Sequence, residues 1–292
     1  MIINFIRGFF MALADSVPGV SGGTIAFIMG FYDKFINSLD GIIFGDKKKK
    51  RESLLFLIKL GIGWIVGMIL SSLILANLFE KKIYIISSLF LGFIIFSIPL
   101  IIKEEKNLLK GKYLNLIFTL IGILVVVLIT LLNPVSSSSK IVDITNLNFG
   151  LIIYIILVGM FAISAMVLPG ISGSTLLLIF GLYIPIMTGI KEVLHLNFAY
   201  LPALIVFGVG VILGVVLVIK SIKKALEKWR SQTIYLILGL MLGSIYAIIM
   251  GPTTLKDQMD PMSLKTFSIL FFIIGGLIIF GLDKLKTILS KK

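Results

Sequence analysis

Long apolar segments, separated by short polar stretches, occupy most of the chain. Six of them reach or approach the roughly 20 residues that a helix needs to cross a bilayer. They are residues 53–76, 83–102, 113–132, 200–219, 233–250 and 266–282. Two more apolar regions, 2–36 and 149–187, are interrupted by proline and glycine. A broken backbone at membrane depth must be satisfied by protein or by a water-filled cavity, so we predict two re-entrant helical hairpins.

The composition agrees with an all-α integral membrane protein. The 292 residues are 58% hydrophobic, and their mean hydropathy is +1.13. The chain has no cysteine and a single histidine, His195, which excludes disulfides, thiolate nucleophiles and a histidine cluster. We therefore expect no metal and no cofactor. The net charge of +13 is spread over several short loops, which is typical of topology-setting lysines rather than of a nucleic-acid surface.

A fifteen-residue motif occurs twice, 151 positions apart. Residues 18–32 read PGVSGGTIAFIMGFY, and residues 169–183 read PGISGSTLLLIFGLY, with eight identities. Both copies place helix-breaking residues and small hydroxyl residues inside apolar surroundings. A matched pair of interrupted segments in two halves of a chain is the best sequence pointer to the binding site of a transporter.

The later spans repeat as well. At a constant offset of 147, glycines of the first half correspond to glycines of the second: Gly61, Gly63 and Gly67 match Gly208, Gly210 and Gly214. Small residues let membrane helices pack closely, and the shared register indicates a duplication. We predict an N-terminal repeat, residues 1–146, and a C-terminal repeat, residues 150–292. Each would contain one hairpin followed by three spans.

The distribution of lysine and arginine predicts the orientation. Arg7, the loops 40–52, 103–112 and 220–232, and the C-terminal tail together contain nineteen basic residues, whereas the intervening loops contain six. Because basic loops stay in the cytoplasm, both termini are predicted to be cytoplasmic. The first hairpin then starts and ends inside, the second starts and ends outside, and three spans follow each. The two halves are therefore predicted to be inverted-topology repeats.

The two motifs carry the candidate chemistry. Pro18 and Pro169 remove a backbone donor, and the neighbouring glycines permit unusual dihedral angles, so each motif can end one half-helix and start another. The hydroxyls of Thr24 and Thr175 then lie near the start of the second arm. Helix N-termini bind anions, so two tips that meet near the midplane would form one anion site. The alternative is a pair of kinked packing hairpins without a ligand.

Few charged residues lie near the motifs. Asp15 lies three residues before the first motif, and its counterpart before the second is the neutral Met166. A charge at membrane depth suggests a function, so Asp15 is the candidate for coupling to a proton or sodium ion. Capping of nearby amides is the alternative role. Arg7 is a candidate phosphate partner, whereas Lys34 and Lys59 are expected to reach the cytoplasmic face.

With both motifs in view, the chain resembles the polyprenyl-phosphate (undecaprenyl phosphate) translocase family PopT, formerly a bacterial membrane domain of unknown function. The resemblance rests on ADSVPGVSGGTIAFIMGFYDKFI and LPGISGSTLLLIFGLY and extends over essentially the whole chain. It implies a transporter in the bacterial plasma membrane that returns undecaprenyl phosphate, the lipid carrier of cell-wall polymer synthesis, from the outer to the inner leaflet. The implied headgroup site comprises Asp15, Ser16, Pro18, Gly19, Ser21, Gly22, Gly23, Thr24, Pro169, Gly170, Ser172, Gly173, Ser174 and Thr175. A bulky side chain at Gly22 or Gly173 is then expected to block transport by occupying the space that the phosphate needs.

Two other functions share many of these features. A polyprenyl pyrophosphate phosphatase would need charge stabilisation and a nucleophile with its base, or a metal. The tips VSGGT and ISGST contain no arginine, histidine or glutamate, so we do not expect an enzyme. An ion-coupled small-anion transporter fits the residues equally well, and only the resemblance favours a lipid. The expected partners are a polyprenyl phosphate, the bilayer and a coupling proton or sodium ion, with no nucleic acid.

Overall fold

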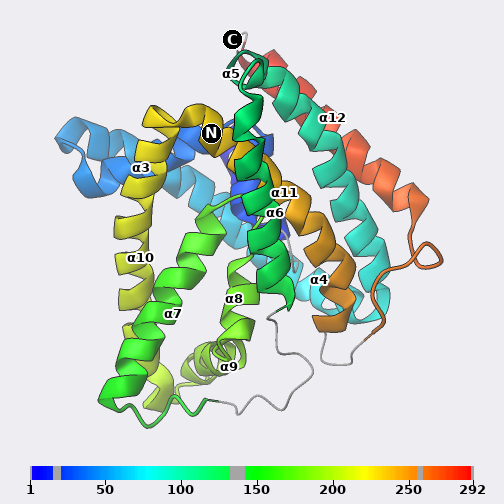
Figure 1. Cartoon of the computed structure of the whole chain (residues 1–292). Helices are drawn as coiled ribbons and strands as arrows, with labels where there is room; N and C mark the ends of the chain where they lie inside the picture. Colours follow the sequence, from blue (N-terminus) through cyan, green and yellow to red (C-terminus); the bar gives the residue numbers. More distant parts are fainter. Residues whose placement is uncertain (1, 16–20, 132–141, 255–258, 291–292) are drawn as a thin grey trace.

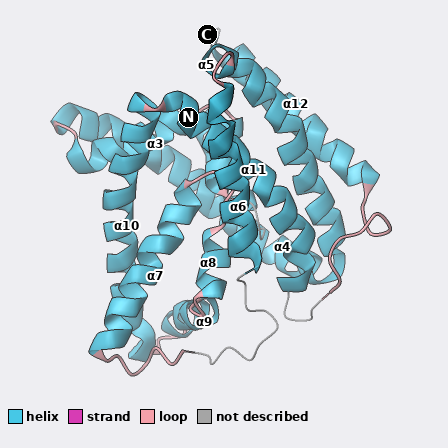
Figure 2. Cartoon of the chain, in the orientation of Figure 1, coloured by secondary structure: helices cyan, strands magenta, loops and turns pink. Residues whose placement is uncertain are grey.

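The computed structural model describes residues 2–15, 21–131, 142–254 and 259–290, and all regular structure in these ranges is helical (Figure 2). The first half contains α1 (Ile2–Asp15), α2 (Gly22–Ile28), α3 (Tyr32–Phe44), α4 (Lys47–Glu104), α5 (Lys106–Leu109) and α6 (Leu116–Leu131). The second half contains α7 (Phe149–Val167), α8 (Gly173–Ile179), α9 (Tyr183–Leu194), α10 (Leu201–Lys228), α11 (Arg230–Met250) and α12 (Ile269–Ser290). The predicted all-α class is confirmed.

Six helical segments of the described chain are long and apolar enough to cross a membrane. They are Lys47–Leu70, Lys82–Glu104, Tyr113–Leu131, Phe149–Val167, Phe198–Lys228 and Arg230–Thr253. Five of them overlap predicted spans, and two of these lie within α4, which a non-helical residue, Lys82, divides into two arms. The sixth, α7, belongs to the region predicted as the second hairpin. The predicted span 266–282 corresponds to α12, whose apolar part, Ile269–Gly281, is shorter.

Both motif regions fold in the same way. A longer helix, α1 or α7, precedes a seven-residue helix, α2 or α8, and then a further helix, α3 or α9. The turn that follows each short helix contains a glycine at a φ of +65°, Gly30 in the first region and Gly181 in the second. Residues other than glycine rarely adopt this left-handed backbone conformation, which explains why the motif has glycine at both positions.

The aligned glycines of the spans make equivalent helix contacts. A Cβ atom added to Gly67 would lie 2.8 Å from the carbonyl oxygen of Phe9, where α4 packs on α1. A Cβ atom added to Gly214 would lie 2.8 Å from the carbonyl oxygen of Met160, where α10 packs on α7. Phe9 and Met160 are 151 positions apart, the offset of the motifs. The first span of each half therefore packs on its own hairpin region through the same close contact.

The last span of each half packs on the other half. In Figure 1, α12 lies beside the second arm of α4, and α6 lies beside α11. Glycines again lie at the contacts: a Cβ atom on Gly92 would lie 3.2 Å from the Cα atom of Gly275, and one on Gly122 would lie 2.8 Å from the carbonyl carbon of Gly239. Because α6 packs on the second half and α12 on the first, these contacts join the two halves into one helical body.

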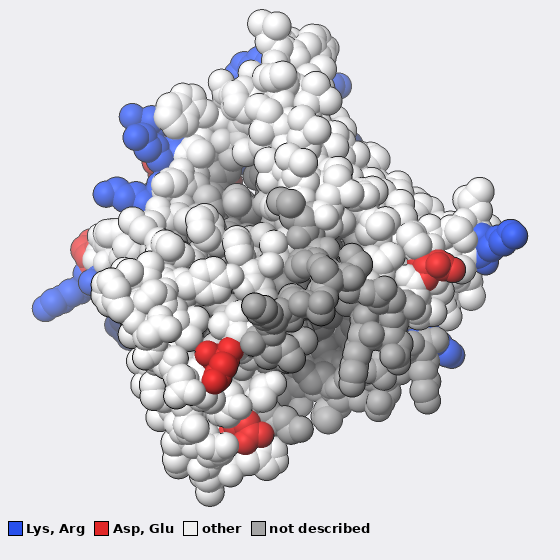
Figure 3. All heavy atoms as spheres, turned by 60° about the horizontal axis from the view of Figure 1, so that its bottom comes forward, with Lys and Arg blue, Asp and Glu red and all other residues white. Residues whose placement is uncertain are grey.

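The outer surface is largely apolar. On α6, Ile117, Leu120, Leu124 and Leu128 are each more than half exposed, as expected for side chains that face lipid. Figure 3 shows one face of the molecule, where uncharged atoms predominate and the basic side chains lie at the margins. In Figure 1, α1 begins and α12 ends toward the upper end of the bundle, whereas α7 begins at the lower end.

The glycine contacts predict a difference between two neighbouring positions of α10. Gly210→Ala should destabilise the protein by about 1–3 kcal/mol through overpacking, because its Cβ atom would lie 2.8 Å from the Cα atom of Ile156. Gly208→Ala is the matched control, since a Cβ atom there has no neighbour within 4 Å. Thermal unfolding in detergent measures the difference, and equal midpoints for the two variants would contradict the packing role.

Candidate functional site

The tip of the first motif is a capped helix start. Ser21 is the N-cap of α2, and its hydroxyl accepts a hydrogen bond from the backbone N–H of Thr24 at 3.3 Å. The Thr24 hydroxyl lies 3.1 Å from the Ser21 hydroxyl. Both side chains are only 1% exposed. Two hydroxyls are thus fixed side by side at the N-terminus of a short buried helix, as the capping preference of serine predicts.

This tip contacts the broken backbone of the second motif region. The Ser21 hydroxyl donates to the carbonyl oxygen of Leu168 at 3.1 Å. The backbone N–H of Gly170, which has a φ of +87°, donates to the hydroxyl of Thr24 at 2.8 Å. Two polar backbone groups of the break after α7 are therefore satisfied by hydroxyls of the other half, which is how buried irregular backbone is tolerated. The first tip therefore contacts the segment between α7 and the second tip.

The hydroxyls of the second tip make no hydrogen bond to the first tip among the described residues. The hydroxyls of Ser172 and Ser174 lie 2.8 Å apart, and Ser172 is buried whereas Ser174 is half-buried. Thr175, the counterpart of Thr24, makes no hydrogen bond through its hydroxyl among the described residues. The hydroxyls of Ser172, Ser174 and Thr175 are therefore not used in the contact with the first tip.

Asp15 holds the first tip in place. Its carboxylate accepts two hydrogen bonds, one from the backbone N–H of Gly22 at 2.6 Å and one from Nε1 of Trp64 at 2.9 Å. The first bond is the capping role that the sequence left as one of two alternatives. The second ties the end of α1 to the first arm of α4. Because Trp64 is 49 residues away in the chain, no sequence pattern indicates this partner.

Asp15 and Met166 occupy equivalent places. A Cβ atom on Gly22 would lie 2.8 Å from a carboxylate oxygen of Asp15, and a Cβ atom on Gly173 would lie 3.1 Å from the sulfur of Met166. Each residue therefore covers the glycine at the start of the short helix in its own half. The two copies differ in charge at this point, with a carboxylate in one and a thioether in the other.

A cavity of about 220 Å³ lies beside the tips. Residues of both halves line it, among them Met11, Asp15, Trp64, Ile163 and Met166. The lining is mostly apolar, and the Asp15 carboxylate and the Trp64 indole supply its polar side chains. Asp15 and Gly22 line this cavity, whereas the hydroxyls of Ser21 and Thr24 are used for the contact with Leu168 and Gly170.

The structure gives Gly22 and Gly173 a different role from the predicted one. The sequence suggested that side chains at Gly22 and Gly173 would occupy space needed by a phosphate. A Cβ atom at either position would instead meet protein atoms, including the carbonyl oxygen of Ala162 at 2.7 Å from Gly173. These glycines first allow α2 and α8 to pack on the helices that precede them. That expectation about space was wrong for the arrangement seen here.

The remaining predicted site residues fall into three groups. Ser16, Pro18 and Gly19 lie outside the described residues. Arg7 lies away from the tips: it donates to the side-chain oxygen of Asn4 at 3.2 Å, and its guanidinium lies 4.6 Å from the ring centre of Phe31. Gly23 and Pro169 are buried at the contact between the tips. No group of three His, Cys, Asp or Glu residues in the described ranges could hold a metal ion.

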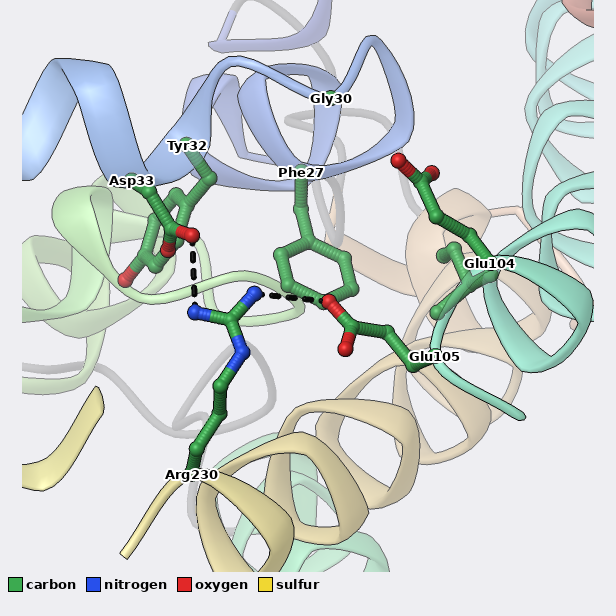
Figure 4. Close-up of a pocket in the computed structure, with 8 residues that line it drawn as sticks. Phe27, Gly30, Tyr32, Asp33, Glu104, Glu105 and Arg230 are labelled. Atoms are coloured by element: carbon green, nitrogen blue, oxygen red, sulfur yellow. Dashed lines mark hydrogen bonds and ion pairs between the residues drawn. The ribbon is translucent and has the colours of Figure 1, made fainter. Parts of the chain in front are cut away.

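A charged cluster that the sequence did not predict joins the halves near α5. Arg230 donates to Asp33 and to Glu105, each at 2.8 Å, beside a cavity of about 70 Å³ (Figure 4). A second ion pair links Lys223 of α10 to Asp40 of α3 at 2.6 Å. Both pairs connect α3, which follows the first tip, to helices of the second half.

Comparisons with known proteins agree with these features. The model of the family described as VCA0040-like, undecaprenyl phosphate translocase-like, matches residues 11–266. A polyprenyl-phosphate transporter of Staphylococcus aureus is 36% identical over 98% of this chain and 97% of its own length. A polyprenyl-phosphate transporter of Vibrio cholerae is 31% identical over 88% of this chain and 80% of its own length. No solved structure matches. The resemblance seen in the motifs is thereby confirmed.

Proposed function

The chain belongs to the undecaprenyl phosphate translocase-like family, and from this premise we propose that it transports polyprenyl phosphate across the bacterial plasma membrane. Transport would return the lipid carrier from the outer to the inner leaflet for cell-wall polymer synthesis. The observation that carries the proposal is the hydrogen-bonded contact between the tips, from Ser21 to Leu168 and from Gly170 to Thr24. It brings hydroxyl and backbone N–H groups of both halves, which are suited to binding a phosphate, close together inside an apolar body.

The groups at this contact suit a phosphate that arrives when the tips part. The Ser21 hydroxyl and the Gly170 N–H donate to protein acceptors here, and both could donate to phosphate oxygens instead. Ser172, Ser174 and Thr175 would add further hydroxyls. Helix N-termini favour anions. If a phosphate oxygen replaces each protein acceptor, the Ser21 hydroxyl and the Gly170 N–H remain hydrogen-bonded. The polyprenyl tail would remain in lipid while the headgroup passes the tips.

The proposal includes an inverted repeat with re-entrant tips and with both termini in the cytoplasm. Its support is threefold: the motif and glycine registers, the equivalent contacts of Gly67 and Gly214, and the opposite starting ends of α1 and α7 (Figure 1). The basic loops that set the predicted orientation belong to the end where α1 begins. Alternating access would then consist of one half moving against the other around the tips.

Inward transport of an anion works against the membrane potential. The potential opposes each negative charge by about 2.3 kcal/mol per 100 mV, so accumulation in the inner leaflet requires a co-moving cation or a steep lipid gradient. Asp15 is the acidic residue at the tips, and it lines the cavity beside them. We assign it the coupling role for a proton or sodium ion, in addition to its hydrogen bonds to Gly22 and Trp64.

Leaflet-resolved transport in proteoliposomes tests the proposed function. A labelled polyprenyl phosphate is supplied in one leaflet, and its arrival in the other is followed with and without an imposed proton or sodium gradient. Protein-dependent movement of the phosphate lipid, with no movement of the matching uncharged polyprenol, is the expected result. Absence of any protein-dependent movement would refute the proposal.

The same vesicles discriminate the competing functions. Uptake of inorganic phosphate without lipid movement would identify a small-anion transporter. Release of phosphate from a polyprenyl pyrophosphate would identify a phosphatase. We expect neither, because the relatives are named as transporters of polyprenyl phosphate and the tips contain no arginine, histidine or glutamate.

A further inference from the structure

A polar groove lies between α1, α3 and the beginning of α4. It is an open groove of about 720 Å³, far larger than the cavity beside Asp15. Its polar lining includes three lysines, Lys34, Lys49 and Lys59, from two helices. The sequence suggested that Lys34 and Lys59 reach toward the cytoplasm independently. In the structure they converge with Lys49 on one groove.

The charge of the groove is positive. Its lining contains one acidic residue, Glu52, against the three lysines. Lys49 lies 4.0 Å from Asp40, but the closer partner of Asp40 is Lys223 at 2.6 Å, so the charge of Lys49 is not cancelled. The ammonium of Lys34 lies 5.0 Å from the ring centre of Phe56, a contact that holds it at the groove. An anion in the groove would meet two net positive charges.

The groove also borders an apolar outer face. Leu55, which lines it, is 48% exposed, and Ile58 and Ile62 of the same helix are 47% and 45% exposed. These positions share one face of α4, since residues three and seven apart are neighbours on a helix. An amphipathic ligand could therefore place a charged headgroup among the lysines and leave its chain on the apolar face.

The groove and the Asp15 cavity lie on the same pair of helices. Asn4 of α1 lines the groove and Asp15 of α1 lines the cavity, about 16 Å apart along the helix axis at 1.5 Å per residue. On α4, Phe56 lines the groove and its neighbour Leu57 lines the cavity. Arg7 lies between the two levels on α1 and donates to Asn4. One further cationic side chain, that of Arg7, thus lies on α1 between the residues that line the groove and the cavity.

We propose that the Lys34–Lys49–Lys59 groove is a second anion site, which holds the phosphate headgroup of a polyprenyl phosphate at the lysine-rich end of the transport route. The assignment rests on the proposed function and adds a separate binding step to it. A headgroup released from the tips would be held here by long-range charge attraction before it leaves for the inner leaflet. The exposed apolar face of α4 would meanwhile accommodate the polyprenyl chain.

The test compares two triple variants in lipid nanodiscs. Lys34→Gln/Lys49→Gln/Lys59→Gln removes the groove charges, and Lys47→Gln/Lys48→Gln/Lys50→Gln removes three exposed lysines of α4 that do not line the groove. Binding of a labelled polyprenyl phosphate is titrated for both and for the parent, with inorganic phosphate as a competitor. A single variant, Glu52→Gln, removes the acidic residue of the groove. Leaflet-resolved transport is measured in parallel.

The groove variant should bind the phosphate lipid at least about tenfold more weakly than the parent, and the control variant less than about twofold more weakly. Glu52→Gln should bind more tightly, and added salt should weaken binding by the parent more than by the groove variant. Equal binding by the two triple variants would overturn the groove site. Full competition by inorganic phosphate at equal concentration would overturn the lipid assignment. If the parent binds the lipid through the groove but does not transport it, the proposed function is refuted and the groove site is not.

Discussion

Replacement of Thr24 by valine should lower the rate of polyprenyl phosphate transport by about tenfold or more. Valine keeps the shape of threonine but removes the hydroxyl that accepts the backbone N–H of Gly170 at 2.8 Å. A buried donor without an acceptor costs about 1–3 kcal/mol, and about 1.4 kcal/mol corresponds to a factor of ten. The joined arrangement of the tips would be depleted, and any transport cycle that passes through it would slow.

Thr24→Ser is the matched control, because serine retains a hydroxyl at the same place. The measurement is the initial rate of leaflet-resolved transport, accompanied by thermal unfolding in detergent to separate a local effect from misfolding. Serine should restore most of the rate that valine loses. Parental transport by Thr24→Val, with the protein folded, would remove the contact between Thr24 and Gly170 from the mechanism.

Replacement of Asp15 by asparagine should abolish uptake driven by an ion gradient while binding of the phosphate lipid remains measurable. At 100 mV, the loss of one coupled charge corresponds to about fiftyfold less accumulation. Asparagine also changes the local hydrogen bonds, because both partners of the carboxylate, Gly22 and Trp64, are N–H donors. The amide can accept from one of them but presents its own donors to the other.

Trp64→Phe separates the coupling role of Asp15 from its structural role. It removes one of the two donors to the carboxylate and keeps the carboxylate itself. If Asp15 couples transport to an ion, Trp64→Phe should still respond to an imposed proton or sodium gradient and Asp15→Asn should not. A parental response by Asp15→Asn would show that Asp15 is not the coupling residue, and passive equilibration of the lipid would then be the better account.

The ion pairs of α3 bear on the same cycle. Arg230 with Asp33, and Lys223 with Asp40, connect the helix after the first tip to α11 and α10 of the second half. Positions 184 and 191, which correspond to Asp33 and Asp40 at the motif offset, are isoleucine and lysine. Neither position carries an acidic residue, so the carboxylates of these two ion pairs have no counterpart at the motif offset in the second half. Such one-sided pairs would have to break whenever α3 moves relative to the second half.

Local sequence determined where helices form and where they break. The length of apolar segments located five of the six spans, since crossing a bilayer requires a continuous apolar stretch, and Pro169 and Gly170 marked the break after α7. Gly30 and Gly181 are identical in the two motif copies, and both adopt a positive φ, which only glycine does readily. The 147-residue register of the glycines likewise predicted repeated helix contacts, which Gly67 and Gly214 make.

Only the tertiary structure decided which faces meet. Helical spacing defines a face but not its partner, so the sequence could not pair Asp15 with Trp64 or Arg230 with Asp33 and Glu105. It suggested that a ligand fills the space at Gly22 and Gly173, whereas protein atoms of the same half fill it. The exchange of α6 and α12 between the halves, and the convergence of Lys34, Lys49 and Lys59 on one groove, depend on helix packing. Packing is fixed by the fit of whole surfaces, and no local pattern encodes it.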